Sequence, residues 1–231
     1  IGNNGVGLTF RYAQNSIIEN VIINNNNPDF EAYEGGGIRV YQGASPTLIN
    51  CSIISNNSNS RGGGIYLENS NATLRHVLIA ENGTGIEKMD NGEFSFVGGD
   101  QRGGGIAMEN SDPVILDHVT IASNYADVSS GMHFNNGSKP VLDFFLAWDN
   151  YSTESTIQVS SGGSMNDVAT NYYLIEDWTN DYWGGGGDLQ CCDSSEQPGY
   201  QDPTTCTSIN VGPFVDSFNL DTLDVNGNLN F

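Results

Sequence analysis

Apolar residues return at regular intervals along this chain, and five apolar stretches each close on an asparagine that leads into a turn. These asparagines are Asn26, Asn56, Asn82, Asn124 and Asn150. Their separations of 30, 26, 42 and 26 residues indicate a repeat of about 26 residues, with extra loop residues in two copies. A repeat of this length is typical of a solenoid, in which each copy forms one turn of a superhelix.

Within each copy, apolar and polar residues alternate with a period of two. The alternating apolar pairs are Ile38 and Val40, Ile65 and Leu67, Ile106 and Met108, and Met132 and Phe134. This period predicts strands with one buried face, and no segment has the spacing of an amphipathic helix. The sequence therefore predicts an all-β fold, a right-handed parallel β-helix solenoid of about five to six coils. We expect it to span residues 1–183, with an irregular C-terminal cap over 184–231.

The repeated asparagines and glycines have structural explanations. An inward asparagine can bond the backbone of its own coil and the asparagines above and below it. A glycine triplet follows three of the turns, at 35–37, 62–64 and 103–105, and indicates a turn where a Cβ would not fit. We therefore expect an asparagine ladder inside the solenoid and assign it no chemistry.

The repeats also carry a family resemblance. Ile53 to Asn56, Ile79 to Asn82 and Ile121 to Asn124 each form an Ile-x-x-Asn element, and a Gly-Gly-Gly-Ile element follows the first and the second after a loop. The combination resembles the repeats of polymorphic outer-membrane adhesins. More broadly, Gly5 to Asn150 is similar to the right-handed parallel β-helix superfamily that includes pectate lyases. That superfamily holds adhesins, lyases, hydrolases and phage spikes, so the resemblance implies a fold and leaves the activity open.

The net charge and the cysteines limit the binding partners and the cellular environment that we expect for this protein. The formal net charge is -21, which argues against nucleic acid and anionic membranes as partners. No apolar run is long enough for membrane insertion. Ile1 to Leu8 read as the end of one coil and the start of another, so we expect a piece of a larger secreted or cell-surface protein.

Cys206 is expected to form a disulfide with Cys191 or Cys192, whereas Cys51 falls in an apolar column and is expected to be a buried thiol.

Candidate chemistry lies on the outward rows of the first strand of each coil. One row is predicted to hold Thr9, Arg39, Tyr66, Ala107, His133 and Gln158, and the next Arg11, Tyr41, Glu68, Glu109, Asn135 and Ser160. Glu68 and Glu109 would then stand about 5 Å apart on adjacent coils. Such a pair suits a retaining glycosidase, with one carboxylate as nucleophile and one as acid, or a Ca²⁺ site. The simplest interpretation is two solvated glutamates on an acidic surface.

Two insertions are predicted to border this strand. They are Asn27 to Glu34, which carries Tyr33, and Gly83 to Gln101, which carries Phe94. Aromatic rings beside carboxylates are what a sugar-binding groove requires, although the rings could also pack under their own loops. The predicted ligand-binding residues are Arg39, Tyr41, Tyr66, His133, Tyr33 and Phe94. The basic residues appear scattered, with Arg61 and Arg102 stacked near Glu34, and His76 and His118 share a column at a corner between strands.

The sequence leaves three functions open. The first is an extracellular binding or adhesion module that contacts a polysaccharide or cell-surface glycan or forms part of a surface layer. The second is a polysaccharide-active lyase or glycoside hydrolase that uses the outward face of the first strand, with Glu68 and Glu109 as candidate catalytic residues. The third is a structural spacer or filament subunit that associates through its coil ends.

Overall fold

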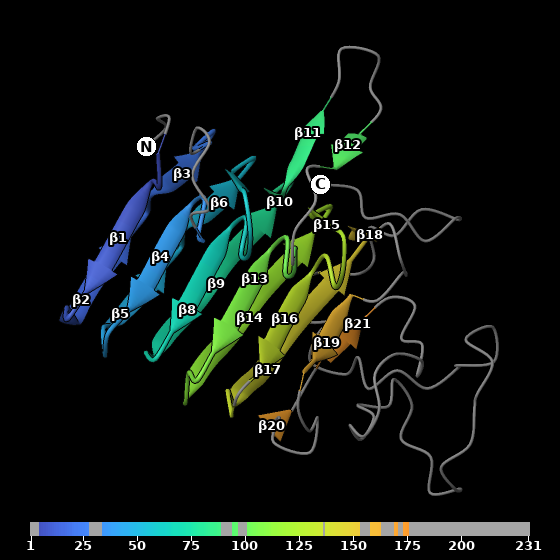
Figure 1. The fold of residues 1–231 in the computed structure, drawn as a ribbon. Coiled ribbons are helices and arrows are strands. Elements are labelled where there is room, and N and C mark those ends of the chain that lie inside the picture. Colours follow the sequence, from blue (N-terminus) through green and yellow to red (C-terminus); the bar gives the residue numbers. More distant parts are fainter. Residues whose placement is uncertain are drawn as a thin grey trace, which may run out of the picture.

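The computed structural model describes residues 5–27, 34–88, 94–96, 101–135, 137–152, 158–162, 169–170 and 173–175. In this part of the chain all regular secondary structure is β, and strands of successive repeats stack side by side in parallel (Figure 1). The result is a solenoid of about five turns whose walls are three parallel sheets. The predicted all-β parallel solenoid is thus confirmed.

Sheet 1 contains the first strand of each turn and has six members. Its strands, in spatial order, are β1 (Leu8–Arg11), β4 (Ile38–Tyr41), β8 (Ile65–Glu68), β13 (Ile106–Glu109), β16 (Met132–Asn135) and β19 (Val159–Ser161). Each strand is adjacent to the equivalent strand of the next turn, so one column of side chains contains one residue from each turn.

Sheet 2 has nine strands and forms the longest wall. The strands are β2 (Gln14–Glu19), β3 (Ile22–Asn24), β5 (Ser45–Ile49), β6 (Ser52–Ile54), β9 (Ala72–Ala80), β14 (Val114–Ala122), β17 (Pro140–Trp148), β20 (Ala169–Thr170) and β21 (Tyr173–Ile175). The long strands bend at one residue with positive φ, namely His76, His118 and Phe144, and Asn20 and Asn50 hold the same place in the first two turns.

Sheet 3 is short and closes each turn. It consists of β7 (Asn57–Ser58), β10 (Gly83–Thr84), β15 (Tyr125–Ala126) and β18 (Tyr151–Ser152). The second predicted insertion begins here, and it contains an antiparallel hairpin of β11 (Ile86–Lys88) and β12 (Phe94–Phe96). The hairpin projects from the solenoid before the chain returns to sheet 1 (Figure 1).

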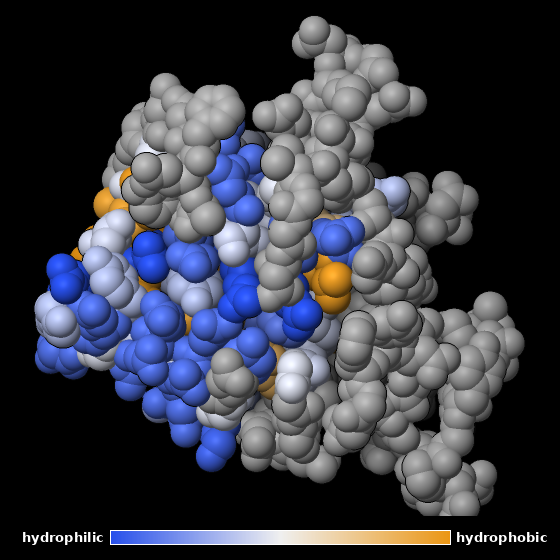
Figure 2. Space-filling model, viewed as in Figure 1, coloured by the Kyte–Doolittle hydropathy of each residue, from blue (hydrophilic) through white to orange (hydrophobic). Residues whose placement is uncertain are grey.

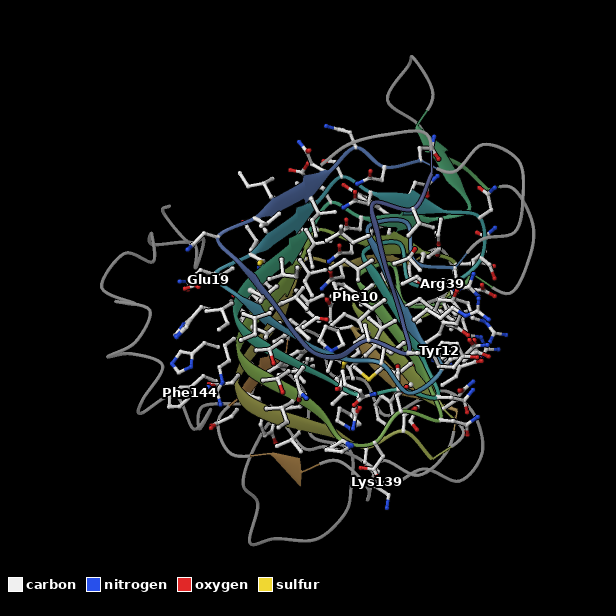
Figure 3. All side chains as sticks on the ribbon, turned by 90° about the vertical axis from the view of Figure 1, so that its left-hand side faces the viewer. Phe10, Tyr12, Glu19, Arg39, Lys139 and Phe144 are labelled. Atoms are coloured by element: carbon white, nitrogen blue, oxygen red, sulfur yellow. The ribbon has the colours of Figure 1, made fainter. Side chains whose placement is uncertain are left out.

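Identical or similar apolar side chains fill the interior in continuous columns. Leu48, Leu74, Leu116 and Leu142 form one column, and each is at most 1% exposed. Figure 3, viewed nearly along the solenoid, shows Phe10 in the interior, Tyr12 and Arg39 outside one wall, and Glu19 and Phe144 outside the opposite wall. Burial of apolar surface stabilises a fold by about 25 cal/mol for each Å², so these columns are the main source of stability.

The predicted asparagine ladder is present at the turn between sheets 2 and 3. The Oδ1 atom of Asn82 accepts from the backbone N of Asn56 at 3.0 Å and from its Nδ2 at 2.9 Å. The Nδ2 of Asn82 donates in turn to Oδ1 of Asn124 and to the carbonyl of Ile53, both at 2.9 Å. That carbonyl belongs to the preceding turn, so the expectation that these amides bond their own coil is wrong for this residue. Every buried polar atom of the carboxamide is therefore satisfied.

The glycine triplets are required because backbone segments approach each other closely. A Cβ on Gly63 would lie 2.2 Å from the carbonyl oxygen of Gly83. The first glycine of each triplet has positive φ, for example 63° at Gly62, and Ser129 takes this conformation in the fifth turn. The predicted restart after each ladder asparagine is thus a steric requirement of the stacked turns.

Candidate functional site

The outward face of sheet 1 contains the predicted candidate residues in one continuous row. Arg11, Tyr41, Glu68, Glu109 and Asn135 are successive Cα partners along β1, β4, β8, β13 and β16. Neighbouring strands are about 4.8 Å apart, so Glu68 and Glu109 occupy adjacent positions as expected. The space-filling view shows that this side of the solenoid is largely hydrophilic (Figure 2).

The sixth strand differs from the predicted alignment by two residues. Ser160, rather than Gln158, is the Cα partner of His133. Gln158 is 3% exposed and its side chain bonds Asn150 of the ladder, so it does not belong to the outward row. The prediction failed because an alignment on asparagines contains no signal for a glutamine that takes the place of the next asparagine.

Glu109 is the most constrained carboxylate of the row. It forms an ion pair with Arg61, and the Tyr66 hydroxyl donates to its Oε2 at 2.9 Å. The Asn135 amide lies 3.4 Å from Oε1. The side chains of Arg61 and Glu109 are 25% and 18% exposed, so water screens this pair only in part. Glu109 is therefore held as an oriented acceptor.

Tyr66 lies beneath this ion pair and is 2% exposed. Burial raises the pKa of its hydroxyl well above the usual tyrosine value, and the charges of Glu109, Glu68 and Glu34 and the hydrogen bond to Glu109 raise it further. Tyr66 is thus a hydrogen-bond donor at all physiological pH values. A role as the base of an elimination reaction would require the opposite pKa shift.

Glu68 differs from Glu109 although the two are neighbours. Among the described residues, its carboxylate has no hydrogen-bond or ion-pair partner, whereas Glu109 has three. Two adjacent carboxylates in different surroundings can perform different tasks. Glu68 is the one whose oxygens can accept from a ligand.

At the end of the row nearest the N-terminus, arginines and tyrosines stack on one another. The Tyr41 ring has the Arg39 guanidinium 4.9 Å and the Arg11 guanidinium 5.7 Å from its centroid. Arg11 also lies 5.1 Å from the ring of Tyr12, which is 65% exposed. We call Arg11, Tyr12, Arg39 and Tyr41 the Arg–Tyr stack. Cation–π contacts of this kind fix the planes of the rings and of the guanidinium groups.

The sequence prediction missed Tyr12. It occupies a corner with φ 55°, where the equivalent residues of the next turns are Gln42, Asn69 and Asn110. Asparagine tolerates this left-handed conformation better than an aromatic residue does. An exposed tyrosine in a column of amide residues is the signal that could have revealed it.

His133 belongs to a separate cluster at the other end of the face. Its Nδ1 is 2.8 Å from Ser160 Oγ, which also contacts Ser129 Oγ, and its Nε2 is 3.4 Å from Arg102. Because the guanidinium can only donate, Nε2 accepts and Nδ1 carries the proton toward Ser160. This tautomer cannot remove a proton from Ser160, and the ring is only 3% exposed. The cluster therefore packs and orients, and His133 is not accessible to a large ligand.

Most of the arginines lie on one face, which the interpretation of scattered basic residues missed, although Arg75 lies on sheet 2. Four of the seven basic residues lie on sheet 1 or in the turn before it, one for each of the first four turns: Arg11, Arg39, Arg61 and Arg102. Arg61 and Arg102 are neighbours, as expected, but Arg61 binds Glu109, and Glu34 forms its ion pair with Arg39 at 3.2 Å. On this face, therefore, arginines offset the negative charge of the glutamates, although the chain as a whole is strongly acidic.

The calcium hypothesis has no complete ligand set in the described residues. No group of three or more His, Cys, Asp or Glu side chains there could hold a metal ion. Glu109 is also bound by an arginine, which competes with a cation. In the part of the chain that the structure describes, Glu68 and Glu109 are thus not joined by a third acidic, histidine or cysteine ligand, and the Ca²⁺ assignment stays a prediction.

Several predicted residues cannot be placed. Tyr33, Cys191, Cys192 and Cys206 lie outside the described residues, and only the backbone of Phe94 is described, in β12. The suggested groove wall, the disulfide and the C-terminal cap therefore stay predictions. Cys51, by contrast, is a buried free thiol in the apolar column, as expected.

The histidine column lies on the opposite wall, in sheet 2. The rings of His76 and His118 are 4.7 Å apart, and His118 stacks on Phe144 at 4.3 Å. Asp117 accepts from Nδ1 of His118 at 2.6 Å and also contacts Arg75. The expected pairing at a corner is present and makes no contact with the face of sheet 1.

Comparison with known proteins agrees with this architecture. Residues 1–99 match a family model described as a right handed beta helix region. The fold is a right-handed parallel β-helix. The matched segment covers the first turns of the solenoid and ends before β13, and the remaining described turns continue the same register. The more specific likeness to adhesin repeats is not confirmed by this match.

No curated protein and no solved structure shows significant similarity to the chain. Within the described residues there is no helix long and apolar enough to cross a membrane. The β-helix fold is therefore the only property that the comparisons supply, and the function must be argued from the residues of the site.

Proposed function

We propose that this β-helix is an extracellular glycan-binding module and that the outward face of sheet 1 is its binding surface. The observation that carries the proposal is the direct adjacency of Tyr41 and Glu68, which are Cα partners on β4 and β8. An aromatic ring beside an available carboxylate offers a stacking surface for the apolar face of a sugar and an acceptor for its hydroxyls.

The rest of the face supports this role by holding the site rigid. Two guanidinium groups lie 4.9 and 5.7 Å from the centroid of the Tyr41 ring and help to hold it, and Glu109 is fixed by Arg61 and Tyr66. Because these side chains are already ordered, a ligand would cost little conformational entropy on binding. Tyr12 extends the aromatic surface toward solvent. The row follows the solenoid over several turns, which suits an elongated ligand such as a polysaccharide.

The test is retention on immobilised polysaccharides, neutral and acidic, with affinities measured by calorimetry for each polysaccharide retained. Replacement of Tyr41 or Tyr12 by Ala should weaken binding roughly tenfold, or about 1.4 kcal/mol. The control is Tyr151→Ala, which removes a tyrosine that is 53% exposed from sheet 3 and should leave affinity unchanged. Equal effects of the three substitutions would contradict the proposed surface, and retention of no polysaccharide would leave a structural spacer as the better account.

A second candidate, a glycoside hydrolase, is favoured by the different surroundings of Glu68 and Glu109. Glu109 is held by Arg61 and Tyr66, whereas the Glu68 carboxylate is available to a ligand, so the two could take different roles in such a reaction. Mass spectrometry of the same polysaccharides after incubation distinguishes the two functions. Fragments that disappear in both Glu68→Gln and Glu109→Gln would establish the enzyme, and retention without fragments supports the binding module.

A further inference from the structure

Six Asn-x-Ser/Thr sequons, the pattern to which N-linked glycans are attached, occur in this chain. Their asparagines are Asn50, Asn56, Asn71, Asn82, Asn136 and Asn150. Asn136 lies outside the described residues. The structure divides the other five into two classes, because three of them belong to the asparagine ladder and two lie on the outside of the solenoid.

The ladder asparagines have no accessible amide. Asn56, Asn82 and Asn150 are 1%, 0% and 4% exposed. Each of them donates two hydrogen bonds from Nδ2, and in Asn56 these go to the carbonyl of Ile23 at 3.0 Å and to Oδ1 of Asn82 at 2.9 Å. An N-linked glycan replaces one hydrogen of Nδ2 by the anomeric carbon of a sugar, so a glycan on the ladder would remove one of these buried bonds.

The ladder also has no room for a sugar. Nδ2 of Asn82 faces the glycine triplet of its own turn, and a Cβ added to Gly64 would lie 3.1 Å from this nitrogen. The same distance from Gly131 to Nδ2 of Asn150 is 3.2 Å. Space this tight for one added carbon atom cannot hold a sugar ring while the turns stay stacked, because the interior is close-packed.

The hydroxyl residue of each ladder sequon has a structural explanation. Ser58, Thr84 and Ser152 are at most 8% exposed and lie in one inward column of sheet 3, in which Ala126 takes the fourth place. Among the described residues Oγ1 of Thr84 has no hydrogen-bond partner, so this column requires a small side chain and not a hydroxyl group. The three ladder sequons therefore arise from two adjacent inward columns of the solenoid and do not indicate surface loops.

The two outward asparagines differ from the ladder in every respect. Asn50 is exposed at the bend of sheet 2, and Asn71 is partly exposed in the turn between β8 and β9. Among the described residues, neither side chain forms a hydrogen bond that a glycan would break. The hydroxyl residues of these sequons, Ser52 and Thr73, are also partly exposed, on β6 and β9.

We propose that the two outward asparagines accept an N-linked glycan that the folded solenoid tolerates, and that a glycan added to a ladder asparagine of the unfolded chain prevents folding. In the transfer, Nδ2 bonds to the anomeric carbon of a lipid-linked oligosaccharide, the bond from that carbon to the lipid diphosphate breaks, and Nδ2 loses one proton. Because the ladder amides are accessible only before folding, glycosylation and folding compete for them. Neither outward asparagine lies in sheet 1, so neither glycan is attached within the proposed binding face.

The test is translation of the 231-residue chain, directed by a cleavable signal peptide into microsomes that hold an oligosaccharyltransferase and its lipid-linked donor. Limited proteolysis separates folded from unfolded chains, and mass spectrometry gives the glycan occupancy of each asparagine in both fractions. We expect glycans on Asn50 and Asn71 in the resistant fraction and ladder glycans in the sensitive fraction only. A ladder glycan in the resistant fraction overturns the proposal. So does the absence of a glycan from either outward asparagine, or from the ladder in both fractions.

A variant with three alanines tests the competition directly. Ser58→Ala, Thr84→Ala and Ser152→Ala together remove the ladder sequons and keep the ladder asparagines, and the column accommodates alanine because Ala126 already occupies it. In microsomes the protease-resistant fraction should rise about tenfold or more, since every chain can then fold without a buried glycan. A resistant fraction equal to that of the wild type overturns the proposal.

Two controls separate the glycan from the side chains that are replaced. Ser52→Ala with Thr73→Ala removes the outward sequons and should lower the mass by two glycans without a rise in the resistant fraction. Translation without microsomes adds no glycan, so there the variant with three alanines should fold no better than the wild type. An equal rise with and without microsomes would mean that alanine itself stabilises the column, and this result overturns the proposal.

Discussion

Gln158 accepts two hydrogen bonds from Asn150, from its Nδ2 at 2.6 Å and from its backbone N at 3.1 Å. It donates to the Asn150 carbonyl oxygen at 3.1 Å. Each ladder asparagine after Asn26 receives the same two bonds from the asparagine before it, as Asn150 receives them from Asn124 at 2.8 and 3.0 Å. A glutamine only eight residues further along the chain therefore takes the position in the ladder that a sixth asparagine would hold.

Replacement of Gln158 by Leu should destabilise the last turn more than the rest of the solenoid. The substitution keeps the volume but leaves the two donors of Asn150 buried without a partner, at about 1–3 kcal/mol for each unsatisfied group. Hydrogen exchange should show faster exchange at Asn150 and in β19 with little change in β4 and β8. Uniform acceleration along the solenoid would mean that Gln158 supports the global fold rather than the end of the ladder.

A break in the middle of the ladder should cost more. Asn82→Ala removes the acceptor for two donors of Asn56 and the donor for the Ile53 carbonyl. We expect a loss of about 3–5 kcal/mol in the free energy of unfolding. Urea denaturation measures it, and Asn71→Ala is the control, because Asn71 is not in the ladder. A loss of less than 1 kcal/mol for Asn82→Ala would show that water replaces the amide.

Alanine at Gly63 and at Gly43 should separate steric from conformational requirements. A Cβ at Gly63 would lie 2.2 Å from a backbone oxygen, whereas at Gly43, with φ 75°, it would meet no atom within 4 Å. Gly43→Ala therefore carries only the strain of positive φ, about 1 kcal/mol. Gly63→Ala must separate two turns and should cost about 3 kcal/mol or more. Thermal unfolding of both variants tests the order, and equal losses would contradict the close packing of the turns.

The regular part of this architecture was predictable from the sequence because stacked turns repeat the same environment. Leu48 and Leu74 fill one column and Asn56 and Asn82 another, so periodicity alone reveals them. The partners of Glu109 were not predictable, since Arg61 is 48 residues away and binds from the turn before a neighbouring strand. Gln158 and Tyr12 depart from the residue type of their columns, and an alignment by residue type misses such departures. Residues that break a repeat are therefore missed unless each column is also searched for exceptions, and here the structure placed both.

The Tyr66–Glu109 contact should give the protein a specific sensitivity to alkaline pH. Burial and the nearby carboxylates raise the pKa of Tyr66 in the folded state above its value near 10 in the unfolded chain. Above pH 10 the unfolded chain loses this proton while the folded protein keeps it, so the stability falls as pH rises. Below pH 10 both states are protonated and this contribution does not vary with pH.

Tyr66→Phe removes this titration together with the hydrogen bond to Glu109. The variant should be less stable than the wild type at pH 7 by about 1 kcal/mol, the net value of one hydrogen bond. Between pH 10 and 12 its free energy of unfolding should fall less steeply, so that the difference between the two proteins narrows. Denaturant titrations at each pH measure both slopes. The control is Tyr125→Phe, because burial also raises the pKa of Tyr125 but at a site without Glu109. Parallel pH profiles for wild type and Tyr66→Phe would show that Tyr66 ionises in the folded state as easily as in the unfolded chain. The assignment of the Tyr66 hydroxyl as a buried hydrogen-bond donor to Glu109 would then be wrong.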